Sequence, residues 1–69
     1  MTQDLHAVAN KVALAVEIEE ARAAELMRMA DQAPGPLIAD HLRNLARERR
    51  VRGLELQSRL AALMAALDQ

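Results

Sequence analysis

Apolar residues recur at intervals of three and four along the first 31 positions of this 69-residue chain. At about 100° per residue, this spacing places them on one side of an α-helix. The pattern therefore predicts a helix over about residues 3–31, with Thr2 or Asp4 available as its N-cap. The stripe consists of Leu5, Val8, Val12, Val16, Ala23, Leu26, Met27 and Ala30.

A second, weaker apolar stripe lies on roughly the opposite side of the same predicted helix. Leu14 and Ile18 are its largest members. A helix that is apolar on two sides usually packs against two partners. We expect the second half of the chain to be one partner, and another copy of the chain, contacting Leu14 and Ile18, to be the other.

The helical pattern is interrupted at residues 32–36, where two prolines flank a glycine. Proline lacks a backbone N–H and disfavours helix in the residue before it, so this segment predicts a turn. Helical spacing then resumes over about residues 37–67. The fold class expected is all-α, with residues 1–69 forming one antiparallel two-helix hairpin. The stripe of the second helix is Ile38, Leu42, Leu45, Leu56, Leu60, Leu63 and Leu67.

Composition favours self-association of this hairpin. The chain has no Cys, Phe, Trp or Tyr, although 52% of its residues are hydrophobic. A chain this short buries little surface by itself, and it has no disulfide to compensate. We therefore expect a homo-oligomer, a dimer or larger, that assembles two hairpins into a four-helix bundle.

Charge is divided unevenly between the two halves. Residues 1–33 carry six acidic and three basic side chains, a net charge of −3, whereas residues 34–69 carry six arginines against four acidic side chains, a net charge of +2. This division favours antiparallel pairing and self-association. There is no basic start followed by an apolar run and no apolar window of about 18 residues. The expected location is cytoplasmic, without membrane contact.

Glu19 is unusual because it falls within the first apolar stripe. A buried carboxylate is costly unless a cation or a metal ion lies beside it. In a hairpin that turns near residue 34, residues whose numbers sum to about 69 face each other, so Glu19 should lie opposite Arg49 or Arg50. The pattern predicts a partly buried ion pair between Glu19 and Arg49. Gly53, in the middle of the second helix, fits either a close approach of the helices or simple tolerance of glycine.

Glu19, the turn and the segment Leu42–Val51 together resemble the helical hairpins of ferritin-like proteins, especially rubrerythrins and encapsulated ferritins. The resemblance covers roughly residues 12–60. It implies that Glu19 and Glu48 bind iron or another divalent metal at a subunit interface, as the Glu of one helix and the Glu-x-x-His of the next do in that family. Val51 stands where the family has the His, so the site would be degenerate.

Arg43, Arg47 and Arg50 share the outer face of the second predicted helix, where they could bind anions such as the phosphates of RNA. The net charge of −1, the absence of aromatic residues and the interruption by Glu48 argue against nucleic acid. Pairing of these arginines with the acidic helix of a neighbouring copy is the favoured interpretation.

Nothing in the chain resembles a catalytic arrangement: Cys is absent, Ser58 is the one Ser, and there is no glycine-rich phosphate loop. We therefore predict a non-catalytic, self-associating helical hairpin that acts in assembly or protein interaction. Iron or other metal binding through Glu19 and Glu48 is the alternative, and RNA binding ranks third.

Overall fold

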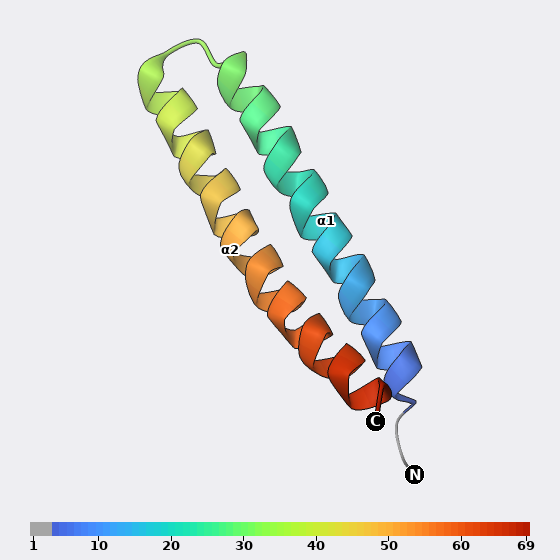
Figure 1. Ribbon diagram of the computed structural model, residues 1–69. Coiled ribbons are helices and arrows are strands. Elements are labelled where there is room, and N and C mark those ends of the chain that lie inside the picture. Colours follow the sequence, from blue (N-terminus) through green and yellow to red (C-terminus); the bar gives the residue numbers. More distant parts are fainter. Residues whose placement is uncertain (1–3) are drawn as a thin grey trace.

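The computed structural model describes residues 4–69, which form two α-helices lying side by side (Figure 1). Helix α1 spans Leu5–Asp31 and helix α2 spans Pro36–Leu67. The hairpin is long and thin, with extents of 52 × 17 × 14 Å. The all-α class and the packing of the two helices against each other are therefore confirmed.

Local sequence sets both ends of α1. The Asp4 side chain caps the first turn by accepting a hydrogen bond from the His6 backbone N–H at 2.9 Å. At the other end, the N–H groups of Gln32 and Ala33 donate to carbonyls of the last turn, each at 3.2 Å. The alternative cap Thr2 and the expected first helical residue, 3, lie outside the described residues.

Helix α2 begins one residue earlier than expected, at Pro36, since the first turn of a helix tolerates a missing N–H. The Gly35 carbonyl accepts the first bond of this helix, from the Ala39 N–H at 3.1 Å. Gly35 itself has a φ of −167°, an extended conformation open to any residue. The two prolines therefore explain the break, and the freedom of glycine is not needed.

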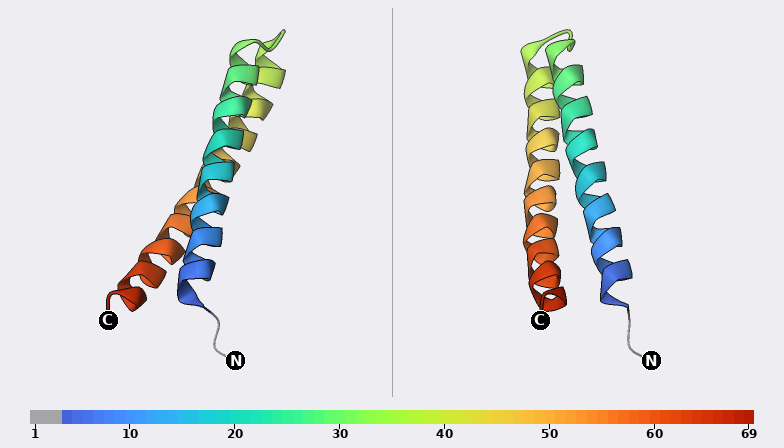
Figure 2. Two further views of the ribbon diagram at one scale, coloured as in Figure 1. Left: turned by 90° about the vertical axis from the view of Figure 1, so that its right-hand side faces the viewer. Right: turned by 45° about the vertical axis from the view of Figure 1, so that its right-hand side comes forward.

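The line of contact between the helices, called the seam below, is built from small residues at every seventh position. A repeat of seven keeps the same positions of two long helices facing each other. Because their side chains are short, the backbones can approach closely. In the left view of Figure 2 the helices cross, and their free ends separate. The buried residues are Ala9, Val16, Ala23 and Ala30 in α1 and Ala39, Ala46 and Gly53 in α2.

The large apolar residues flank the seam and are only half-buried, as at Val12, Leu26 and Leu56. The predicted stripes need two corrections, because Leu5 and Ile38 are exposed. Both lie in the first turn of their helices, where the facing helix offers them little cover. The predicted stripe of α2 also followed the leucines and omitted its buried alanines and glycine.

Candidate self-association site

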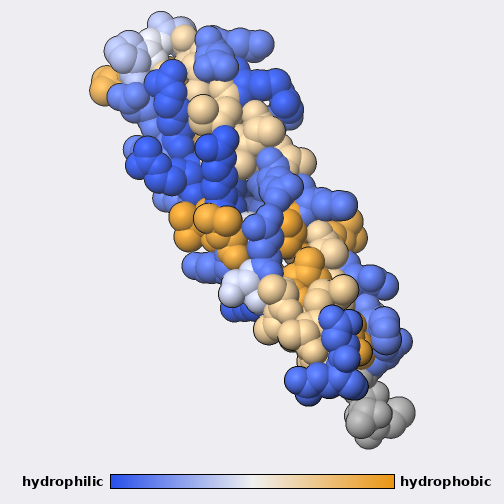
Figure 3. Space-filling view, in the orientation of Figure 1, coloured by the Kyte–Doolittle hydropathy of each residue, from blue (hydrophilic) through white to orange (hydrophobic). Residues whose placement is uncertain are grey.

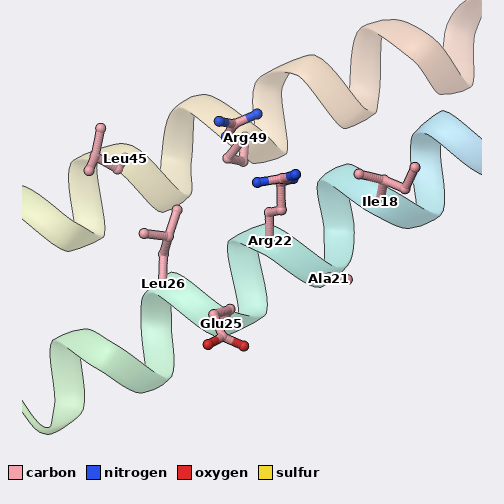
Figure 4. Close-up of a pocket in the computed structure, with 7 residues that line it drawn as sticks. All are labelled: Ile18, Ala21, Arg22, Glu25, Leu26, Leu45 and Arg49. Carbon is pink, nitrogen blue, oxygen red and sulfur yellow. The ribbon is translucent and has the colours of Figure 1, made fainter.

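Two open hollows lie along the hairpin between α1 and α2. The upper hollow, nearer the turn, has a volume of about 550 Å³, and the lower one about 480 Å³. Figure 4 shows the upper hollow, which is lined by Ile18, Ala21, Arg22, Glu25, Leu26, Leu45 and Arg49. The lower hollow is lined by Val8, Val12, Arg59, Ala62 and Leu63.

Both hollows are on the same side of the hairpin. Arg22 of the upper hollow follows Val8 of the lower one by two repeats of seven, and Arg59 of the lower hollow follows Leu45 of the upper one by the same interval. Residues separated by whole repeats of seven occupy nearly the same side of a helix. The two hollows therefore form one continuous surface, called the hollow face below.

The hollow face exposes much apolar side chain. Ile18 is 46% exposed, while Leu26 and Leu45 beside it are half-buried. Leu14, which the sequence paired with Ile18 as an interface residue, lies one turn earlier on α1 and is also exposed. Of these two residues, Ile18 lines the upper hollow, and Leu14 lines neither hollow.

Glu19 and Arg49 meet across the seam, next to the upper hollow. The Arg49 Nη1 lies 3.4 Å from Oε1 and 3.3 Å from Oε2 of Glu19. The Glu19 side chain is 15% exposed and the Arg49 side chain 33%. Gly53 faces this pair, and a Cβ atom added there would lie 3.8 Å from the Glu19 Cβ. This distance is an ordinary van der Waals contact, so the seam has room for a Cβ atom at position 53.

Arg22 brings a second guanidinium to the same hollow. Figure 4 shows it reaching toward α2 beside Arg49, whereas Glu25 points away. Glu25 instead pairs with Arg28 at 3.0 Å. No ion pair within residues 4–69 includes Arg22. The upper hollow is therefore lined by two cations amid apolar side chains: Arg49, which pairs with Glu19 in the adjoining seam, and Arg22, which has no ion-pair partner within residues 4–69.

The structure does not bring the two candidate metal ligands together. Glu19 lies in the seam, whereas Glu48 lines a different hollow on α2 with Val51 and Arg52. Nowhere in residues 4–69 do three His, Cys, Asp or Glu side chains gather in a way that could hold a metal ion. A site using both residues would need a second copy of the chain and would have to displace Arg49 from Glu19.

Arg43, Arg47 and Arg50 gather on the other side of the seam, where they line a small hollow with Met27 and Ala46. They therefore flank α1, which differs from the outermost position expected for them. Arg43 pairs with Asp40 at 3.4 Å. Figure 3 shows hydrophilic residues over the turn-proximal half of α2, the half that contains these arginines.

Farther along the hairpin, a hydrogen bond joins the two helices on this second side. Gln57, one repeat of seven after Arg50, donates from Nε2 to Glu20 Oε1 at 2.9 Å. Arg43 and Leu45 are two residues apart, about 200° around α2, so this side and the hollow face flank the seam from opposite directions. The three arginines with Glu20 and Gln57 are called the arginine face below.

Comparison of the chain with protein-family models, curated proteins and solved structures gives no significant match. Neither helix within residues 4–69 has an apolar stretch long enough to cross a membrane. The two faces of the hairpin are therefore the features that bear on function, and the ferritin-like resemblance stays a hypothesis.

Proposed function

We propose that this chain is a non-catalytic assembly module whose hairpins associate with one another through the hollow face, most simply as a two-fold four-helix bundle. The observation that carries the proposal is that the buried residues are small, whereas larger apolar residues stay partly exposed. Nothing larger than Val16 is buried within residues 4–69, while Ile18, Leu26 and Leu45 remain partly in water on one side. A second hairpin would cover them.

The total surface supports the same conclusion. The chain has a mass of 7.6 kDa and an accessible surface of 5422 Å². A compact monomer of this mass exposes about 4,300 Å². A standard protein interface removes roughly 800 Å² from each partner. Pairing through one face would bring each hairpin close to the exposure that is usual for a stable folded protein.

Substitution of Ile18 tests the proposal. Ile18→Asp places a charge in the upper hollow and removes about 1.5–3 kcal/mol of apolar burial in each copy of a symmetric dimer. We expect the dissociation constant to rise at least 100-fold, measured by native mass spectrometry over a range of concentrations. Leu54→Asp is the matched control, because Leu54 is 64% exposed and lines neither hollow.

The wild-type protein and Leu54→Asp should both give a mass of two or more copies, with circular dichroism showing unchanged helix in both variants. A wild-type monomer at tens of micromolar would contradict the proposal, and so would equal loss of association in the two variants. Repeating the spectra after adding ferrous iron in air addresses the alternative. We expect no discrete gain in mass, because the Glu19 carboxylate is already paired with Arg49. Stoichiometric iron uptake would instead favour the metal-binding hypothesis.

A further inference from the structure

The proposed association through the hollow face leaves the orientation of the two hairpins open, and the charges on the helices bear on it. Resting on that proposed function, we propose that the hairpins pair with their turns at the same end of the bundle. Helix α1 of each copy then packs against α2 of the other, and Arg22 pairs with the partner subunit's Glu48. The partner that each hairpin binds is therefore a second copy of the same chain.

Two-fold symmetry allows two ways of laying one hollow face on another. An axis parallel to the helices puts both turns at one end and sets α1 against the partner's α2. An axis across the helices puts the turns at opposite ends and sets each helix against its own counterpart. Both arrangements make every neighbouring pair of helices antiparallel, so packing preference alone does not separate them.

Net charge separates the two arrangements. Helix α1 carries five acidic and three basic side chains, a net charge of −2, and α2 carries six arginines and three acidic side chains, a net charge of +3. With the turns at opposite ends, helices of like charge lie side by side. With the turns together, each acidic helix lies beside a basic one. Complementary charge at an interface fixes orientation and disfavours the wrong arrangement.

Individual side chains agree with this orientation. Glu48 lies one turn beyond Leu45 and about 60° around α2 from it, in the neighbouring hollow with Val51 and Arg52, and is exposed. The Glu19–Arg49 contact fixes which levels of the two helices match. Arg22, one turn closer to the hairpin bend than Glu19, is therefore about level with residues 46–48.

With both turns at the same end, corresponding levels of the two copies meet, so Arg22 lies beside the partner subunit's Glu48. No ion pair among residues 4–69 includes either residue. In the opposite orientation, an axis through the middle of α2 would instead bring Glu48 near the partner subunit's Glu55, a contact between like charges.

Spin labels measure the orientation directly, because the chain has no Cys and one introduced Cys gives a unique site. Gln32→Cys places a label beside the turn. With the turns together, two such labels lie about 15–30 Å apart, a few helix diameters. With the turns at opposite ends, their separation approaches the 52 Å length of the hairpin. Double electron–electron resonance distinguishes these distances.

Glu17→Cys is the control, because Glu17 is exposed near the middle of α1. This label gives a short distance between copies in either orientation. Short distances from both sites support the proposal. A short distance from Glu17→Cys with a long one from Gln32→Cys overturns the orientation while leaving self-association intact. No dipolar signal from either site overturns the self-association itself.

Charge reversal tests the proposed ion pair. Arg22→Glu and Glu48→Arg should each raise the dissociation constant about three- to tenfold, since each reversal acts twice in a symmetric dimer. The double variant should return to within about threefold of wild type. Glu17→Arg, away from the hollow face, should leave the constant unchanged. A double variant that loses as much as the two single variants combined overturns the pairing.

Discussion

The hollow face and the arginine face flank the same seam of two helices, yet they leave very different surfaces. The hollow face holds partly exposed Ile, Leu and Val side chains around a guanidinium, Arg22, that has no carboxylate partner within residues 4–69. The arginine face exposes three arginines and closes with the hydrogen bond between Gln57 and Glu20. One face is suited to being covered and the other to remaining in water.

The contrast between the two faces shows that, beside a narrow seam, the flanking residues determine the character of each surface. Small residues such as Ala23 and Ala46 fill the line of closest approach and bury little apolar area by themselves. The side chains on each flank then determine whether that face of the hairpin stays exposed to water. Substitutions confined to one flank should therefore have effects on that side, and those effects should differ in size between the two faces.

The largest of these effects is expected at Arg49. Removing it with Arg49→Ala leaves the Glu19 carboxylate, which is 15% exposed, without a partner in the seam. An unsatisfied charged group at such a site costs about 2 kcal/mol. Gln57→Ala removes one exposed hydrogen bond on the arginine face and should cost about 0.5 kcal/mol or less. Urea denaturation compares the two free energies of unfolding at one protein concentration.

Glu19→Ala sharpens the same test. It should cost about 1 kcal/mol, less than Arg49→Ala, because the longer Arg49 side chain can extend its head into water. The double alanine variant should cost less than the sum of the single variants, since it leaves no unpaired charge. Equal losses for Arg49→Ala and Gln57→Ala would show that the seam pair is as weak as an exposed contact.

Much of the fold could be predicted from the sequence because its signals are local. The prolines at 34 and 36 set the break, the apolar periodicity set the helices, and Asp4 provided a cap. The seam was harder to predict, because alanine is common on every side of both helices and carries no strong pattern. The buried role of Ala39, Ala46 and Gly53 depends on the match between the helices, which the large residues alone did not reveal.

The candidate site was predictable in part. Counting residues from the turn sets Arg49 or Arg50 opposite Glu19, and in the structure the Glu19 side chain meets Arg49. The unpaired state of Arg22 could not be predicted, because Glu25, at i+3, has the spacing of an ion-pair partner on a helix. In the structure Glu25 pairs with Arg28 instead, and this pairing depends on side-chain rotamers that residue spacing does not specify.

A smaller effect of opposite sign is expected at Gly53. Gly53→Ala should raise the free energy of unfolding by about 0.5–1 kcal/mol, because alanine restricts the unfolded chain and favours helix. The added Cβ would lie 3.8 Å from the Glu19 Cβ, an ordinary van der Waals contact. Thermal unfolding at fixed protein concentration measures the change. A loss of stability would mean that the seam needs the closer approach that only glycine permits.

The smallest effect on assembly is expected on the arginine face. Replacing Arg43, Arg47 and Arg50 together by Ala removes three exposed charges and the 3.4 Å pair between Arg43 and Asp40. Exposed pairs contribute about 0.2–1 kcal/mol, so we expect a modest loss of stability. The dissociation constant of the dimer should stay within about threefold of wild type, because these side chains lie on the side of the seam away from the hollow face. A loss of association as large as that of Ile18→Asp would mean that the copies pair through the arginine face.

An RNA titration with the same variant tests whether these arginines bind phosphates instead. If they do, RNA binding should weaken steeply with salt in the wild type and less steeply in the variant.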